Sequence, residues 1–146
     1  MILKCPVVWT GQKPAMMEIP RAALTADALA ESAEVFNFSI ADLTQRIFGI
    51  NGGENGSCLP ACRDEKVLPF DPRQTLDVVG VGQLVEAAVK RGRETRPDLR
   101  CGLSGEHGGD PASIRFACKI GMNFVSCSPY RIPIARLAAA QAAIKQ

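Results

Sequence analysis

A short apolar run followed by a helix-like segment recurs four times along this sequence. Such alternation is typical of α/β proteins in which crossover helices join parallel strands. The chain has 146 residues, whereas a complete eight-unit barrel takes about 250. The pattern therefore predicts about four β/α units, arranged either as an open doubly wound sheet or as part of a closed barrel. The predicted strands are 15–19, 35–40, 100–104 and 123–127.

The predicted helices rest on capping residues and on the spacing of apolar residues. Thr25 is expected to cap a helix over 26–33. Asp110 followed by Pro111 has a cap and a first-turn proline in their preferred order, with Gly121 at the predicted end. Apolar residues three to four apart predict a further helix over 81–89, and a proline opens an alanine-rich one over 134–144.

Residues 49–73 form the longest stretch without periodicity. Glycine and proline are concentrated there, at Gly49, Gly52, Gly53, Gly56, Pro60, Pro69 and Pro72. Long connections of this kind are uncommon in small domains and often carry function. We therefore predict a long loop with little regular structure.

The charge pattern argues against binding to nucleic acid or to an anionic membrane. Seventeen basic and fifteen acidic residues leave a net charge of +2, without long runs of either sign. No run of eighteen apolar residues could span a bilayer. Residues 1–4 are interrupted by charge too early for a secretory signal, so we expect a cytoplasmic protein.

The cysteines predict neither a disulfide framework nor a zinc site. The chain has six cysteines and one histidine, His107. Only Cys58 and Cys62 approach the spacing of zinc ligands. Because the chain is large enough to form its own core and has no export signal, we expect reduced thiols.

Two carboxylates are predicted at the ends of consecutive strands. In parallel α/β folds, reactive residues gather where strands end and helices begin. Glu18 and Asp42 lie at such positions and could hold Mg²⁺, which takes one or two protein carboxylates and completes its shell with water and substrate oxygens. The alternative is that both are solvated or helix-capping acids.

Ser104 lies at the end of the third predicted strand, directly before the turn Gly105-Glu106-His107-Gly108-Gly109. Such a glycine-flanked turn can bring backbone close to a ligand, and His107 could do acid–base work near neutral pH. A hydrogen-bonded structural histidine is the more frequent alternative.

Several motifs at these strand ends form a specific combination. They are Met17–Leu24, Asp42–Gln45, Gly80–Leu84, Gly105–Gly109, Val125–Arg131 and Pro133–Ala142. Together they resemble the C-terminal region of the pyruvate, phosphate dikinase family, one of the phosphoenolpyruvate (PEP)-utilising enzymes. The resemblance runs from about Ala15 to the end of the chain. PEP synthase and enzyme I of the sugar phosphotransferase system are less similar.

The resemblance implies a TIM-type (β/α)8 barrel that binds PEP and pyruvate, of which this chain supplies the C-terminal half. The family enzyme interconverts ATP, pyruvate and phosphate with AMP, PEP and pyrophosphate. A swivelling domain with a phosphohistidine carries the phosphoryl group to the barrel. By motif, Glu18 and Asp42 correspond to the family's two magnesium ligands, and the Mg²⁺ would bridge the phosphoryl group and the pyruvate enolate.

Two substrate positions depart from the family pattern. Ser39-Ile40-Ala41 stands where the family has glycine–threonine–asparagine, so Ala41 lacks the substrate-binding amide. Ser104 stands where the family has the cysteine that protonates the enolate. A serine hydroxyl is a far weaker acid than a thiol, whose pKa is near 8.5. Cys101, three residues back on the same strand, is expected to face the opposite side.

The resemblance also divides the chain. Residues 1–14 match nothing expected there and form an atypical N-terminal segment, whereas residues 15–146 form a partial PEP/pyruvate-binding barrel domain. The arginines that grip the phosphoryl group, the nucleotide-binding domain and the phosphohistidine domain have no counterpart in these residues.

Three functional hypotheses follow. The first is a fragment of a dikinase-like phosphotransferase, inactive by itself. The second is a non-catalytic binding or interaction module that kept the half-barrel scaffold and lost the chemistry. The third is a half-barrel that self-associates, because half a barrel leaves strand edges unpaired and apolar side chains exposed.

Overall fold

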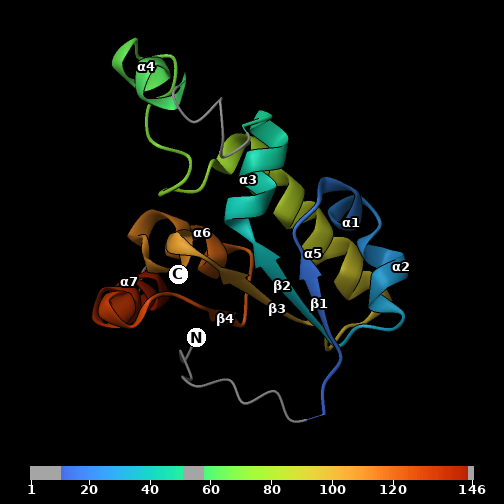
Figure 1. Cartoon of the computed structure of the whole chain (residues 1–146). Coiled ribbons are helices and arrows are strands. Elements are labelled where there is room, and N and C mark those ends of the chain that lie inside the picture. Colours follow the sequence, from blue (N-terminus) through green and yellow to red (C-terminus); the bar gives the residue numbers. More distant parts are fainter. Residues whose placement is uncertain (1–10, 51–57, 145–146) are drawn as a thin grey trace.

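The computed structural model of the chain describes residues 11–50 and 58–144 (Figure 1). Its centre is a four-stranded parallel sheet, which confirms the predicted α/β class. The spatial order of the strands is their order along the chain. A doubly wound sheet reverses its strand order at a switch point, so this unbroken order is that of consecutive units of a β/α barrel. The strands are β1 (Pro14–Met17), β2 (Val35–Ser39), β3 (Arg100–Ser104) and β4 (Phe124–Val125).

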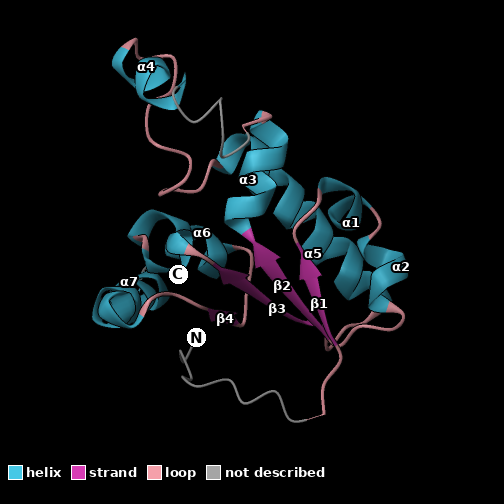
Figure 2. Ribbon diagram, viewed as in Figure 1, coloured by secondary structure: helices cyan, strands magenta, loops and turns pink. Residues whose placement is uncertain are grey.

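Helices occupy every connection between the strands (Figure 2). None of those in the described part of the chain is long and apolar enough to cross a membrane. The α-helices are α1 (Pro20–Leu24), α2 (Ala26–Ala30), α3 (Ile40–Phe48), α4 (Cys58–Asp64), α5 (Gln83–Thr95), α6 (Pro111–Lys119) and α7 (Ile132–Ile144). The shorter turns are the π-helical η2 (Val78–Gly82) and the 3₁₀-helical η3 (Glu106–Gly109) and η4 (Pro129–Arg131).

The helix predicted to start after Thr25 is present as α2, with Thr25 at its N-cap position, but the expected side-chain cap is not formed and a further helix precedes it. The helical region begins at Pro20, which occupies the first turn, and breaks at Thr25 into α1 and α2. The Thr25 hydroxyl donates to the Arg21 carbonyl four residues back, at 2.9 Å. It therefore ends α1 instead of accepting from the amides of α2.

The prediction of a long loop with little regular structure over 49–73 is wrong in part. Residues 51–57 lie outside the described residues, but Cys58–Asp64 form α4. Pro60 does not prevent this helix, because it lies in the first turn, where an amide has no intrahelical partner. In Figure 1, α4 stands apart from the sheet, on the side to which the strands point.

The main core lies between one face of the sheet and the helices. Phe36, Phe38, Cys101 and Leu103 are fully buried and pack with apolar residues of the surrounding helices. Contact between α5 and the sheet is close at Gly92, because a Cβ there would lie 2.6 Å from Leu99 Cδ2 and 2.8 Å from the Phe36 ring. Glycine at this position allows the approach.

A second, smaller cluster joins α6 to α7. Ile114 and Cys118 of α6 pack against a row of alanines on α7, which are Ala135, Ala138, Ala139 and Ala142. Small side chains let the two helix backbones come close together. The predicted cap of α6 is confirmed, since the Asp110 carboxylate accepts from the Ser113 amide at 2.8 Å.

The other face of the sheet is the side that would form the interior of a barrel. Met16 and Asn37 are paired there on neighbouring strands, and the Met16 side chain is 53% exposed. The face continues at Gly102, which pairs with Phe124 of β4. A Cβ on Gly102 would lie 2.1 to 2.4 Å from three atoms of the Phe124 ring, so the ring covers the glycine.

Candidate functional site

The candidate site is the edge formed by the C-terminal ends of β1, β2 and β3. Strand register aligns these ends, because Met17 pairs with Phe38 and Ser39 pairs with Ser104. Glu18 directly follows Met17, and Asp42 lies in the first turn of the helix that begins after Ser39. The chain segments that carry Glu18, Asp42 and Ser104 therefore leave neighbouring strands at one edge, in agreement with the predicted topology.

Asp42 is the most highly connected polar residue of this edge. One carboxylate oxygen, Oδ2, accepts a hydrogen bond from the Ser39 hydroxyl. The other, Oδ1, lies 3.5 Å from Arg46 Nη1, one helical turn further along α3. Both side chains of this ion pair are 42% exposed, so the carboxylate remains accessible to a ligand. Asp42 does not cap α3, because the N-cap position belongs to Ser39.

Ser39 and Arg46 were missed in the sequence analysis, although a local signal existed. Serine three residues before an acid is the spacing of a helix N-terminus, and an arginine four residues after an acid lies on the same helical face. Here the Ser39 side chain donates to the carboxylate and makes no bond to a backbone amide of the helix. It holds the carboxylate of Asp42 at the strand end.

Ser104 is the last residue of β3, and its hydroxyl donates to the Phe38 carbonyl of β2 at 3.2 Å. The hydroxyl proton is thereby directed to the backbone of the sheet. The segment after Ser104 approaches the start of α3, since a Cβ on Gly105 would lie 4.0 Å from the Ala41 Cβ. Ala41 thus lies close to the residue that directly follows Ser104.

The second half of the turn, His107–Gly109, packs inside the protein, whereas Gly105 and Glu106 are exposed. For Gly108 and Gly109 this is contrary to the ligand-approach interpretation. A Cβ on Gly108 would lie 2.1 Å from the Ser126 carbonyl oxygen, and one on Gly109 would lie 2.3 Å from Arg131 Cδ. Only glycine permits these close approaches. The turn fits against the chain that follows β4.

His107 is a buried structural residue. Its side chain is fully buried, and Nε2 lies 2.9 Å from the Pro72 carbonyl oxygen. Burial lowers the pKa of His107, while the Pro72 carbonyl and the nearby Asp110, Glu106 and Asp71 act in the opposite direction. A ring that is closed off from solvent cannot exchange a proton with a substrate at the strand ends, so the acid–base interpretation is not supported.

Cys101 cannot replace the missing thiol. Its side chain belongs to the core on the helix side of the sheet, as the alternation along the strand predicted. Burial raises the pKa of the Cys101 thiol to about 11. The group is therefore a neutral thiol at physiological pH and faces away from the candidate site.

The donor set at the strand ends fits a hard divalent cation. Glu18 is exposed and Asp42 is accessible, and both offer carboxylate oxygens from neighbouring strands. Mg²⁺ needs no more than one or two such groups from the protein. The described residues contain no cluster of three or more His, Cys, Asp or Glu side chains, the kind of set that would form an all-protein metal cage.

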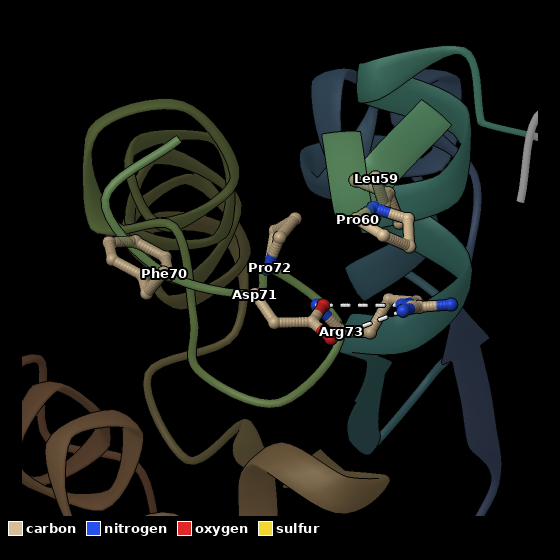
Figure 3. A pocket seen from close by; sticks show the side chains of 6 residues that line it. All are labelled: Leu59, Pro60, Phe70, Asp71, Pro72 and Arg73. Atoms are coloured by element: carbon tan, nitrogen blue, oxygen red, sulfur yellow. Dashed lines mark hydrogen bonds and ion pairs between the residues drawn. The ribbon is translucent and has the colours of Figure 1, made fainter. Parts of the chain in front are cut away.

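A small cavity lies between α4 and the segment that follows it. Figure 3 shows its lining by Leu59, Pro60 and the run Phe70–Arg73. Its volume is about 20 Å³, which is enough for one water molecule. Arg73 pairs with the Asp71 carboxylate at 3.2 Å beside it. The cavity is too small for a substrate.

Comparison with known proteins gives consistent matches. A family model described as "PEP-utilising enzyme, PEP-binding domain" matches residues 10–144. The chain is 60% identical over 129 residues to a pyruvate, phosphate dikinase of Clostridium symbiosum. It is 54% identical over 126 residues to pyruvate, phosphate dikinase 2 of Oryza sativa subsp. japonica, and 51% identical over 129 residues to the chloroplastic pyruvate, phosphate dikinase 1 of Arabidopsis thaliana.

These alignments cover most of this chain and a small part of each relative. They include 88%, 86% and 88% of this chain, in the same order, but only 15%, 14% and 13% of the relatives. The chain therefore spans about one seventh of the length of these curated relatives.

Proposed function

Since this chain belongs to the PEP-utilising enzymes and corresponds to a fragment of a pyruvate, phosphate dikinase-like protein, we propose that it supplies part of a magnesium-dependent pyruvate and PEP site. The reaction of the complete protein would be ATP + pyruvate + phosphate to AMP + PEP + pyrophosphate. The observation that carries the proposal is the alignment of Glu18, Asp42 and Ser104 at the ends of three adjacent parallel strands.

Glu18 and Asp42 would hold the Mg²⁺ ion. When bound, the ion would supply positive charge that stabilises the phosphoryl group and the enolate. The chain's own contribution is orientation. Ser39 fixes one oxygen of the Asp42 carboxylate, and Arg46 stands beside the other. Glu18 is carried on the adjoining strand end, where no hydrogen bond or ion pair within the described residues holds its carboxylate.

We propose that the chain is inactive by itself. Ser104 has a hydroxyl where the family has a thiol acid, and this hydroxyl already donates to Phe38. Ala41 has a methyl group where the family has an amide. The other barrel strands, the nucleotide-binding domain and the phosphohistidine domain would have to come from elsewhere, as partners.

The alternative is a non-catalytic module that keeps the scaffold. The same two positions favour it, because they remove the proton donor and a substrate contact while the strands, the caps and the core remain. An assay of PEP formation distinguishes the two functions, with pyruvate, ATP and phosphate as substrates and a protein completed with the missing parts. PEP formation supports the dikinase-like site, and its absence supports the non-catalytic module.

We also propose that the chain is cytoplasmic and that it self-associates. Within the described sheet, β1 and β4 each pair on one side only, and Met16 is exposed on the face that the missing half of a barrel would cover. A second copy could supply that cover. Light scattering tests this, and a monodisperse monomer with a sharp cooperative melt would contradict it.

Calorimetric titration with MgCl₂ tests the metal site. We expect Glu18→Gln and Asp42→Asn each to weaken binding at least about tenfold, since even loss of a group behind a metal ligand costs about 10–100-fold. Asp27→Asn in α2 is the matched control, because Asp27 is exposed and lies in the helix that leads to the start of β2, not at the strand ends. Equal binding by all four proteins would contradict the proposed site.

A further inference from the structure

His107 makes a buried hydrogen bond to a segment 35 residues earlier in the chain. A carbonyl oxygen can only accept, so the bond to Pro72 requires the proton on Nε2. The other ring nitrogen, Nδ1, is also buried and has no hydrogen-bond partner among the described residues. The ring is therefore held in one neutral tautomer.

A second buried bond joins the same two parts of the protein. The Leu76 amide donates to the Ser113 hydroxyl at 2.9 Å. That hydroxyl in turn donates to the Asp110 carboxylate at 2.7 Å. Between the two anchors, the Arg73 amide donates to the Asp71 carboxylate, and the Gln74 amide donates to the Asp71 carbonyl. Residues 71–76 thus form a folded segment, here called the 71–76 segment, that is fastened at both ends to the chain following Ser104.

We propose that His107 is a positioning residue, which holds the 71–76 segment against the loop after Ser104 only while its imidazole is neutral. Protonation would place a new N–H at Nδ1, where no acceptor is available, and would put a charge in the interior. Opening of the segment exposes the ring to water and relieves both costs. The hydrogen bond from His107 to Pro72, here called the latch, is therefore an acid-sensitive contact beside the strand ends. This inference does not depend on the proposed metal binding.

The charged groups around the ring oppose this effect but do not outweigh it. Glu106 comes from η3, Asp110 from the cap of α6 and Asp71 from the 71–76 segment, and all three favour the imidazolium ion. Burial acts against that ion and is the larger effect, so the pKa of His107 lies below its ordinary value. The free energy that keeps the segment closed is therefore fully present above the pKa of the imidazole in the open state, about 6.5. It is lost as the pH falls toward the lower pKa of the imidazole in the closed state.

The composition of the chain makes this latch unusually easy to test. His107 is the only histidine in the sequence. Carboxyl groups have ordinary pKa values near 4 and thiols near 8.5. His107 is therefore the one side chain whose ordinary pKa lies between pH 5.5 and 7.5, and comparison with a variant at position 107 removes the contribution of the α-amino group, whose ordinary pKa is about 7.7–8.0.

The experiment is hydrogen exchange by mass spectrometry on the 146-residue chain between pH 5.5 and 7.5. Exchange is expressed as a protection factor, which removes the pH dependence of chemical exchange. The reporting amide is that of Leu76, and a peptide over Val35–Ser39 reports global unfolding. The variants are His107→Gln, whose side-chain nitrogen can still donate to Pro72 but cannot be protonated, and His107→Leu, which has no donor.

We expect the Leu76 protection factor of the wild-type chain to fall by up to about tenfold from pH 7.5 to pH 5.5. That limit is set by titration of the open state with a pKa near 6.5. His107→Gln should keep protection at pH 7.5 and lose the pH dependence, whereas His107→Leu should show low protection throughout.

A pH-independent wild-type protection factor would overturn the proposal. A His107→Gln variant as pH-dependent as the wild type would also overturn it. If His107→Leu unfolds globally, protection over Val35–Ser39 will be lost as well, and the comparison of wild type with His107→Gln then decides.

Discussion

Substitution of Gly102 by alanine tests the packing that fixes β4 beside the candidate site. The added Cβ would lie 2.1 to 2.4 Å from the Phe124 ring. The ring would have to move by about 1.5 Å to reach an ordinary carbon–carbon separation. Overpacking of this kind costs about 1–3 kcal/mol, and alanine returns about 0.4–1 kcal/mol by restricting the unfolded chain. We expect Gly102→Ala to lower the free energy of unfolding by about 1–2 kcal/mol.

A double-mutant cycle with Phe124→Ala isolates the cause. Without the ring, Gly102→Ala should be neutral or slightly stabilising, which gives a coupling free energy of about 2 kcal/mol between the two positions. Urea unfolding followed by far-ultraviolet circular dichroism measures the free energy of unfolding of all four proteins. The slope of this free energy against urea concentration should be the same for each of them. An equal cost of Gly102→Ala with and without the ring would refute the placement of Phe124 over Gly102.

Three further predictions concern the cap, the buried thiol and the two substituted positions. Asp110→Ala should lower the free energy of unfolding by about 1–2 kcal/mol, because the Ser113 amide and hydroxyl lose their acceptor; an unchanged urea midpoint would contradict this. Native Cys101 should react with iodoacetamide at pH 8 at least about a hundredfold more slowly than in the unfolded chain, since burial raises its pKa to about 11; equal rates would contradict its burial. In a protein completed with the family's missing parts, Ser104→Cys together with Ala41→Asn should raise PEP formation far more than either change alone, and a wild-type rate within a few-fold of the double variant would refute catalytic loss.

Local chemistry was sufficient to predict much of the fold. The strand over Arg100–Ser104 and the capped start of α6 at Asp110 and Pro111 were predicted to the residue. These elements depend on alternation and capping within a few residues. Thr25 shows the limit of such rules, because the same hydroxyl can cap a following helix or, as here, bond back to the preceding one.

The features that the sequence analysis missed depend on distant partners. The repeat pattern alone left the strand order open between a doubly wound sheet and barrel units, and only the family resemblance predicted the half-barrel with which the observed order agrees. The bond from His107 to Pro72 joins residues 35 positions apart, and no local pattern around either residue specifies it. Glycines at 108 and 109 were recognised as a turn, but the close approach of Ser126 and Arg131 that explains them is visible only in three dimensions.

The central claim is that Glu18 and Asp42 bind one divalent cation at adjacent strand ends. A crystal structure of the chain grown with Mn²⁺, with anomalous diffraction recorded, tests this most directly. We predict one anomalous peak between the two carboxylates, with an oxygen of each within about 2.2 Å of the ion, close to the 2.0–2.1 Å typical of Mg²⁺. Carboxylates more than roughly 10 Å apart could not share one ion at such distances, and that result, or a peak on only one of them, would contradict the account.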